Sequence, residues 1–133
     1  MPLHFTHDEE IVSRWSSFPD DSLVAYIGNY PSEPVLESID VYCRQLRPHN
    51  ENWDDVINTG GREDGSGYKS TGFVNEYKER LSDQESEWQM RKLLYSSIHR
   101  PVYIGHHPRK REYSPAGVLI DEIQSLDTIQ HTQ

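Results

Sequence analysis

The sequence predicts a mainly α-helical domain of the α+β class, with about five or six helices and a small two-stranded β element. Three observations predict it. Apolar residues recur at helical spacing in several segments, and two short apolar runs, 23–27 and 102–104, each precede a glycine. The length of 133 residues fits one domain. We therefore expect a single domain over 1–133, with a flexible loop at 58–72, where five of the eight glycines fall.

The first predicted helix covers 7–17. Thr6 and Glu9 have the spacing of a capping box, and the apolar residues that follow share one face. The run 23–27, closed by Gly28, predicts a strand. A second helix over 33–46 begins after Ser32, and Cys43 lies on its apolar face as a small buried thiol.

The second half of the chain predicts helices over about 72–81 and 83–98, the latter opened by a capping box at Ser82 and Glu85. A seven-residue repeat of apolar side chains keeps one continuous helix as an alternative. Residues 102–104 predict the second strand, which ends before Gly105. Ser114 then caps a last helix.

Two segments resemble each other. Residues 25–31 align with 102–108, and Tyr, Ile, Gly and Pro match in both. Either the match is chance, or two equivalent strands pair side by side and each turns at its glycine.

Charge is segregated along the chain. The first 64 residues hold 13 acidic and four basic side chains, so they account for the whole net charge of −9. The segment 88–111 holds six cations and no carboxylate. Either the basic segment folds back and neutralises the acidic half, or each patch faces a partner of opposite charge.

The sequence shows no enzyme motif. Tyr68 interrupts the only stretch that resembles a phosphate-binding loop. The seven histidines form no metal-ligand series, and His106 and His107 would point to opposite faces of a strand. The single cysteine, Cys43, excludes an internal disulfide. We expect no catalytic residue, no metal and no cofactor.

These observations predict a non-enzymatic protein–protein interaction module, an acidic inhibitor, antitoxin-like or adaptor protein that acts by charge complementarity. Its size and charge are those of immunity proteins and phage inhibitors, and it could also form homo-oligomers. The partner would be another protein, basic or nucleic-acid-binding. The expected contact residues are aromatic and basic on one side and acidic on the other: Trp88, Arg91, Tyr95, Arg100, Arg109, Lys110, Arg111, Glu9, Glu10, Asp54 and Asp55.

Two alternatives remain. The basic and aromatic segment 88–111 could bind nucleic acid, with cations on phosphates and aromatic rings under bases. The second is a small hydrolase of unseen mechanism.

No run approaches the roughly 18–20 apolar residues of a membrane span, and no secretory signal begins the sequence. With one cysteine, a cytoplasmic location is expected, or a nuclear one in a eukaryotic host.

Overall fold

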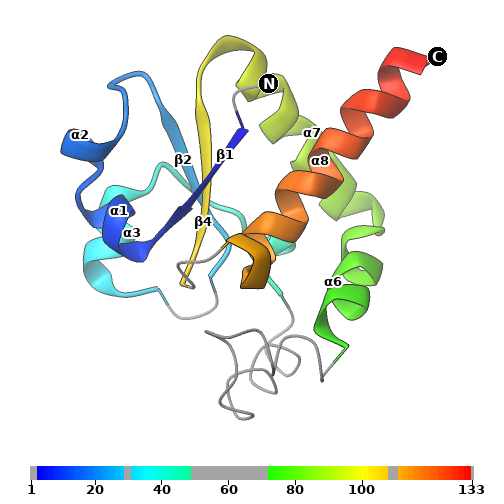
Figure 1. The fold of residues 1–133 in the computed structure, drawn as a ribbon, viewed down its shortest axis with the longest axis horizontal. Coiled ribbons are helices and arrows are strands. Elements are labelled where there is room, and N and C mark those ends of the chain that lie inside the picture. The colour runs from blue at the N-terminus through cyan, green and yellow to red at the C-terminus, as the bar shows by residue number, and fades with distance from the viewer. Residues whose placement is uncertain (1–2, 29–30, 49–71, 108–110, 133) are drawn as a thin grey trace.

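The computed structural model describes residues 3–28, 31–48, 72–107 and 111–132, and it shows an α/β fold (Figure 1). Four parallel strands form one sheet, flanked by helices on both faces. The predicted helical domain with a small two-stranded element is therefore wrong. Within the described ranges, no helix combines the length and the apolar character needed to cross a bilayer.

The sheet has the order β1-β4-β2-β3. The central strands β2 and β4 pair in parallel, with Ala25 opposite Ile104, and β1 pairs along the other side of β4. The strands are β1 (Leu3–His7), β2 (Leu23–Tyr26), β3 (Val41–Tyr42) and β4 (Val102–His106). Because all four run in the same direction, their carboxyl ends meet at one edge of the sheet.

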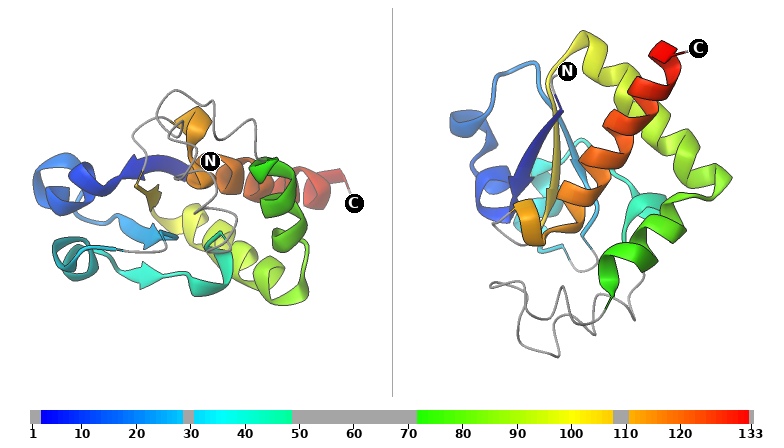
Figure 2. Two further views of the ribbon diagram at one scale, coloured as in Figure 1. Left: turned by 90° about the horizontal axis from the view of Figure 1, so that it is seen from below. Right: turned by 45° about the vertical axis from the view of Figure 1, so that its right-hand side comes forward.

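Helices cover both faces of the sheet, which makes three layers (Figure 2). One layer contains α1 (Asp8–Val12), α2 (Arg14–Ser17) and α3 (Glu33–Ser38). The other contains α6 (Phe73–Leu81), α7 (Gln84–His99) and α8 (Pro115–Thr132). Two short 3₁₀ helices, η1 (Arg44–Leu46) and η2 (Arg111–Tyr113), complete the described elements.

Alternating side chains of the central strands supply two separate apolar cores. Ala25 and Ile104 belong to the larger core, with α6, α7 and α8, whereas Val24 and Tyr26 belong to the smaller one, with α1 and α3. A strand that is buried on both faces has an uninterrupted apolar sequence. This explains why 23–27 and 102–104 lack the polar alternation of a half-exposed strand.

The two similar segments lie side by side as β2 and β4, which agrees with one of the two alternatives left open by the sequence. Their register differs from the sequence alignment by two residues, since Tyr26 lies opposite Gly105 and not Tyr103. Gly105 also does not end its strand, which continues to His106.

Several element predictions need correction. The strand β1 occupies residues 3–7, where no strand was expected. The predicted helix 33–46 is wrong beyond Ser38, because β3 and η1 follow α3 within that range. The helix predicted over 7–17 is divided at Ser13 into α1 and α2.

The helices of the second half agree with the sequence. Two helices, α6 and α7, replace the alternative of one continuous helix, and α8 begins at Pro115 with the Ser114 hydroxyl accepting from the Ala116 amide. The capping residue of α7 is Asp83, whose carboxylate accepts from the Ser86 amide at 3.0 Å. Both predicted capping boxes are thus wrong, since Thr6 instead donates to Glu10 and Ser82 donates to the Glu79 carbonyl. The loop predicted at 58–72 lies outside the described residues, apart from Gly72.

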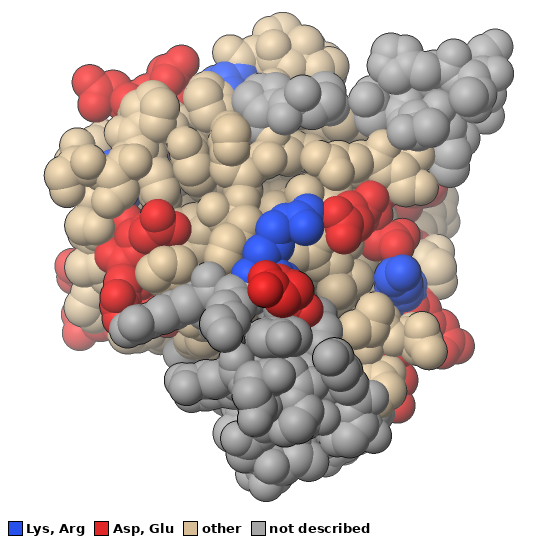
Figure 3. All heavy atoms as spheres, in the orientation of Figure 1, with Lys and Arg blue, Asp and Glu red and all other residues tan. Residues whose placement is uncertain are grey.

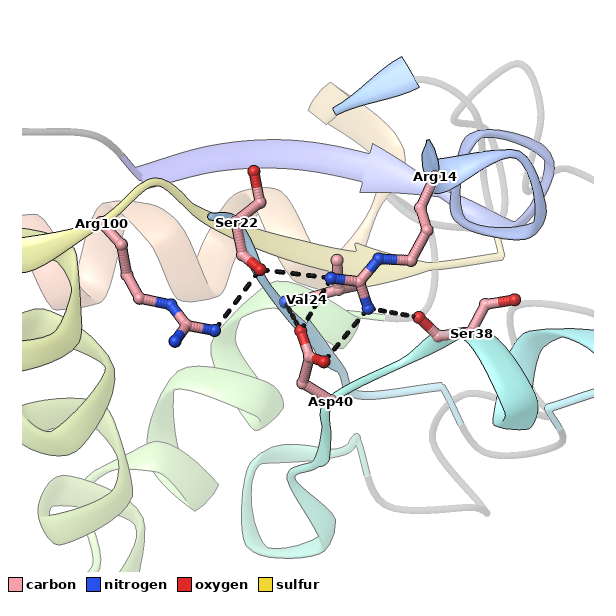
Figure 4. Close-up of polar contacts among 6 residues, drawn as sticks. All are labelled: Arg14, Ser22, Val24, Ser38, Asp40 and Arg100. Atoms are coloured by element: carbon pink, nitrogen blue, oxygen red, sulfur yellow. Dashed lines mark hydrogen bonds and ion pairs between the residues drawn. The ribbon is translucent and has the colours of Figure 1, made fainter. Parts of the chain in front are cut away.

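A buried arginine ties α2 to the amino ends of β2 and β3 (Figure 4). Arg14 is only 6% exposed and donates to both carboxylate oxygens of Asp40, each at 3.1 Å, and to the carbonyls of Ser22 and Ser38. Asp40 also accepts from the Val24 amide at 2.8 Å. Burial acts to raise the pKa of Asp40, but these hydrogen bonds and the positive charge of Arg14 outweigh it and lower that pKa. The network fixes the smaller helical layer against the sheet.

Candidate functional site

The structure places three of the predicted contact residues on one exposed face of α7. Trp88 is 62% exposed and Tyr95 is 66% exposed, and they follow each other at a spacing of seven residues, two helical turns. Arg91 lies between them, together with Lys92, whose ammonium is 5.2 Å from the centre of the Trp88 ring. We call Trp88, Arg91, Lys92 and Tyr95 the α7 face.

Two open grooves meet on the α7 face, and both are lined by Trp88 and Arg91. Lys92 and Tyr95 line the second groove. The first extends toward the start of the helix, where its walls are acidic and polar: Gln84, Glu85 and Glu87. Arg91 is paired with Glu87 at 3.2 Å, so the face combines aromatic rings with charges of both signs.

The other predicted basic residues lie elsewhere. Arg100 follows α7 and donates to the Ser22 carbonyl at 3.4 Å, at the amino end of β2. Arg111 pairs with Asp121 of α8 at 2.7 Å. Arg109 and Lys110 lie outside the described residues. Among the described residues of the patch expected over 88–111, those on α7 lie together, whereas Arg100 and Arg111 lie apart from them.

The predicted acidic contacts are partly described. Glu9 is exposed on α1, and Glu10 accepts a hydrogen bond from Thr6 at 3.0 Å and lies 3.6 Å from the His7 ring. Acidic side chains are visible on the side of the molecule where α1, α2 and α3 lie and also on the opposite side (Figure 3). Asp54 and Asp55 lie outside the described residues.

A second cluster lies at the carboxyl edge of the sheet. Asp8 directly follows β1, Tyr26 ends β2 and His107 directly follows β4. One carboxylate oxygen of Asp8 lies 2.7 Å from Nδ1 of His107, and the other accepts from the Tyr26 hydroxyl at 2.7 Å. The Tyr26 hydroxyl is 3.0 Å from the same imidazole nitrogen. We call Asp8, Tyr26 and His107 the edge triad.

Burial and hydrogen bonding set the protonation of the edge triad. Tyr26 is fully buried, and burial together with its bond to Asp8 raises the pKa of the phenol. For Asp8, burial acts to raise the pKa, but the hydrogen bonds from His107 and Tyr26 outweigh it and lower the pKa. Asp8 is therefore ionised and Tyr26 is protonated at neutral pH. The side chains of Asp8 and His107 remain 30% and 21% exposed, so water can reach them.

The side chains around the triad leave room for this arrangement. A β-carbon on Gly28 would lie 2.4 Å from the Tyr26 ring, so the glycine lets that ring lie along the end of β2. Tyr42, at the end of β3, donates to the Gly28 carbonyl at 2.6 Å. Polar contacts of residues that end or follow the four strands thus gather at this edge, and carboxyl ends of parallel strands are where open α/β sheets bind ligands.

The sequence reasoning missed the edge triad. It considered the histidines only as metal ligands and found no ligand series among them. Asp8 and His107 each directly follow a strand, and this position was a usable signal. The two residues come together, however, only because their strands are parallel neighbours in the sheet. A β1–β4 pairing was not foreseen.

The single cysteine and a possible metal site were the other candidates considered. Cys43 is buried as expected, although it precedes η1 and is not within a long helix, and burial raises the pKa of its thiol to about 11. Among the described residues, no group of three or more histidine, cysteine, aspartate or glutamate side chains is arranged to hold a metal ion.

Comparison of the chain with known protein families, curated proteins and solved structures finds no significant match.

Proposed function

We propose that the protein is an adaptor or inhibitor that binds another protein through the α7 face. The observation that supports this is the outward placement of two large aromatic side chains, Trp88 and Tyr95, beside Arg91 on one regular helix. Tryptophan, tyrosine and arginine are the residues enriched at the energetic centres of protein interfaces.

The charges around Trp88 favour a protein partner over nucleic acid. Glu85 and Glu87 line the groove on one side of the ring, and Arg91 is already paired with Glu87. Nucleic-acid binding depends on several cations that contact phosphates together. The α7 face offers Lys92 and a paired arginine, on a chain with a net charge of −9.

The chemistry of the face also describes the partner. Trp88 and Tyr95 would insert into apolar recesses, and Lys92 would meet a carboxylate at the rim. This differs from the basic partner that the acidic half suggested.

The test compares two exposed tryptophans. Tagged wild-type protein, Trp88→Ala and Trp15→Ala are used to capture proteins from a lysate of the source organism. Trp15 is 74% exposed on α2, in the other helical layer, so it is a matched control. We expect wild type and Trp15→Ala to capture the same protein and Trp88→Ala to lose it. With that partner purified, the Kd of Trp88→Ala should be at least about tenfold higher than that of wild type.

Two results would contradict the proposal. The first is a partner held equally by wild type and Trp88→Ala. The second is binding of labelled DNA or RNA that weakens steeply with salt and is lost in Trp88→Ala, which would assign the face to nucleic acid.

A further inference from the structure

We infer that the edge triad is a hydrolytic site in which His107 is the general base, Asp8 orients it, and the substrate is an ester or amide with an uncharged carbonyl group. This inference concerns the carboxyl edge of the sheet and is independent of the α7 face.

The first argument is location. The triad is assembled from residues 8, 26 and 107, which are far apart in sequence and meet only because β1, β4 and β2 are neighbours in a parallel sheet. Ligands of open α/β folds bind in this position, outside the carboxyl ends of the strands.

The second argument is the geometry of the imidazole. Asp8 lies 2.7 Å from Nδ1 of His107, and a carboxylate in that position holds the proton on Nδ1. The lone pair is then on Nε2, where a general base needs it. A carboxylate that fixes the tautomer and stabilises the imidazolium has the same role in serine hydrolases.

Tyr26 is a positioning residue. Its hydroxyl donates to the second oxygen of Asp8 at 2.7 Å, and its ring is fully buried, so it fixes the carboxylate and cannot itself reach a substrate. The hydroxyl is also too firmly protonated to act as the nucleophile. The hydrogen bonds described for the imidazole go only to Asp8 and Tyr26, and neither supplies a nucleophile, so we assign that role to water.

The step balances without a further reactant. Nε2 of His107 accepts a proton from water while the water oxygen bonds to the carbonyl carbon. When the tetrahedral adduct collapses, the bond from that carbon to the leaving oxygen or nitrogen breaks, and the imidazolium returns its proton to the leaving atom.

The neighbours of the imidazole decide the class of substrate. The groups described in contact with His107 are the carboxylate of Asp8, the phenol of Tyr26 and the ring of His106. Phosphoryl transfer requires cations that neutralise the charge on the phosphate oxygens, whereas the carboxylate of Asp8, 2.7 Å from the imidazole, would repel an anionic substrate. An uncharged carbonyl group avoids repulsion by Asp8.

The experiment measures hydrolysis of p-nitrophenyl acetate by the full chain. Wild type is compared with His107→Asn, Asp8→Asn and the control His4→Asn, which removes an exposed imidazole on β1. The hydrolysis rate should fall about a hundredfold in His107→Asn and about tenfold or more in Asp8→Asn, while His4→Asn keeps the wild-type rate.

A second readout covers variants that do not fold. In the wild-type protein, diethyl pyrocarbonate should modify His107 faster than His4, as mass spectrometry of the peptides would show, because Asp8 holds the proton on Nδ1 and leaves the lone pair on Nε2. Equal rates for wild type and His107→Asn, or slower labelling of His107 than of His4, would overturn the inference. Faster hydrolysis of p-nitrophenyl phosphate than of the acetate would overturn the substrate class.

Discussion

Two glycines determine how the side chains at the carboxyl edge are placed. A β-carbon on Gly28 would lie 2.4–2.6 Å from three atoms of Tyr26, and one on Gly105 would lie 2.5 Å from Ile11. The first glycine makes room for the phenol that binds Asp8, and the second lets α1 pack closely against β4. The similarity of the two segments that contain these glycines thus reflects a shared need for space beside a strand and not two equivalent turns.

Gly28→Ala tests the role of this space. The new methyl group must displace the Tyr26 ring, which breaks its hydrogen bond to Asp8, so we expect a loss of about 1–3 kcal/mol in the free energy of unfolding. Urea denaturation measures the loss, and Tyr26 resonances in NMR spectra should shift.

The control is Gly72→Ala, where a β-carbon meets nothing within 4 Å but the backbone φ is +68°. That variant should lose stability through backbone strain alone and leave Tyr26 unchanged. A Gly28→Ala protein within about 0.5 kcal/mol of wild type would show that the ring has room to move.

Asp40 makes stability depend on acid pH. Its pKa is lowered in the folded protein, so its contribution is present above the unfolded value of about 3.9 and is lost as pH falls through the lower folded value. Asp40→Asn should cost about 1–3 kcal/mol at pH 7, and its stability should fall less steeply than that of wild type below pH about 4.

Urea unfolding of the two proteins between pH 7 and pH 2.5 measures this difference. Glu37→Gln, which changes an exposed carboxylate on α3, serves as control and should follow wild type at every pH. Parallel acid profiles for Asp40→Asn and wild type would contradict the assignment of the Arg14 network.

The elements differ in how clearly the sequence encodes them. The helices α6, α7 and α8 each have a repeating apolar face, so both ends of α6 and α7 and the start of α8 could be predicted to within one residue. The strands β1 and β3 could not. β1 is an edge strand whose residues Leu3–His7 mix polar and apolar side chains, and β3 contains only two residues.

The error at 33–46 has a physical reason. Apolar residues at helical spacing continue past Ser38, but Asp40 leaves the helix because its backbone and side chain both bond to Val24 of β2. A tertiary contact thus overrides the local pattern, and no neighbouring residue in the sequence announces it.

The start of α7 offers a prediction at the scale of one helix. Asp83 accepts from the Ser86 amide, whereas the Ser82 hydroxyl bonds back to the Glu79 carbonyl of α6. Asp83→Ala should therefore lower the midpoint of thermal unfolding by a few degrees, and Ser82→Ala should change it little. Circular dichroism measures the midpoint of thermal unfolding of each variant. A larger decrease for Ser82→Ala than for Asp83→Ala would support the capping box predicted from the sequence and contradict Asp83 as the cap.

The whole molecule consists of two unequal halves on either side of the sheet. The larger core joins α6, α7 and α8 to the strands, while the smaller one contains Ile11, Phe18, Val24, Tyr26 and Val35. The acidic first half of the chain forms the smaller layer and most of the edge triad, and the α7 face belongs to the larger layer. Among the described residues, the Arg91 and Arg111 ion pairs are formed within the second half of the chain, and the Arg14 ion pair is formed within the first.

This asymmetry predicts that the two layers open separately. Regions with few buried apolar contacts open at a lower free energy than the core, and hydrogen exchange under native conditions detects such openings. The free energy of opening measured for amides of α1 and α3 should be lower than that measured for amides of β4 and α7. Ile11→Ala should lower the free energy of opening of the α1–α3 layer by about 2–4 kcal/mol, because Ile11 is fully buried in the smaller core.

The matched variant is Ile123→Ala, which removes an equally buried isoleucine of α8 from the larger core. It should lower protection throughout the protein, since global unfolding depends on that core. Equal loss of protection in all elements with both variants would show that the molecule opens as one unit. In that case the Arg14–Asp40 network and the edge triad would couple the smaller layer to the sheet more strongly than its apolar contacts do.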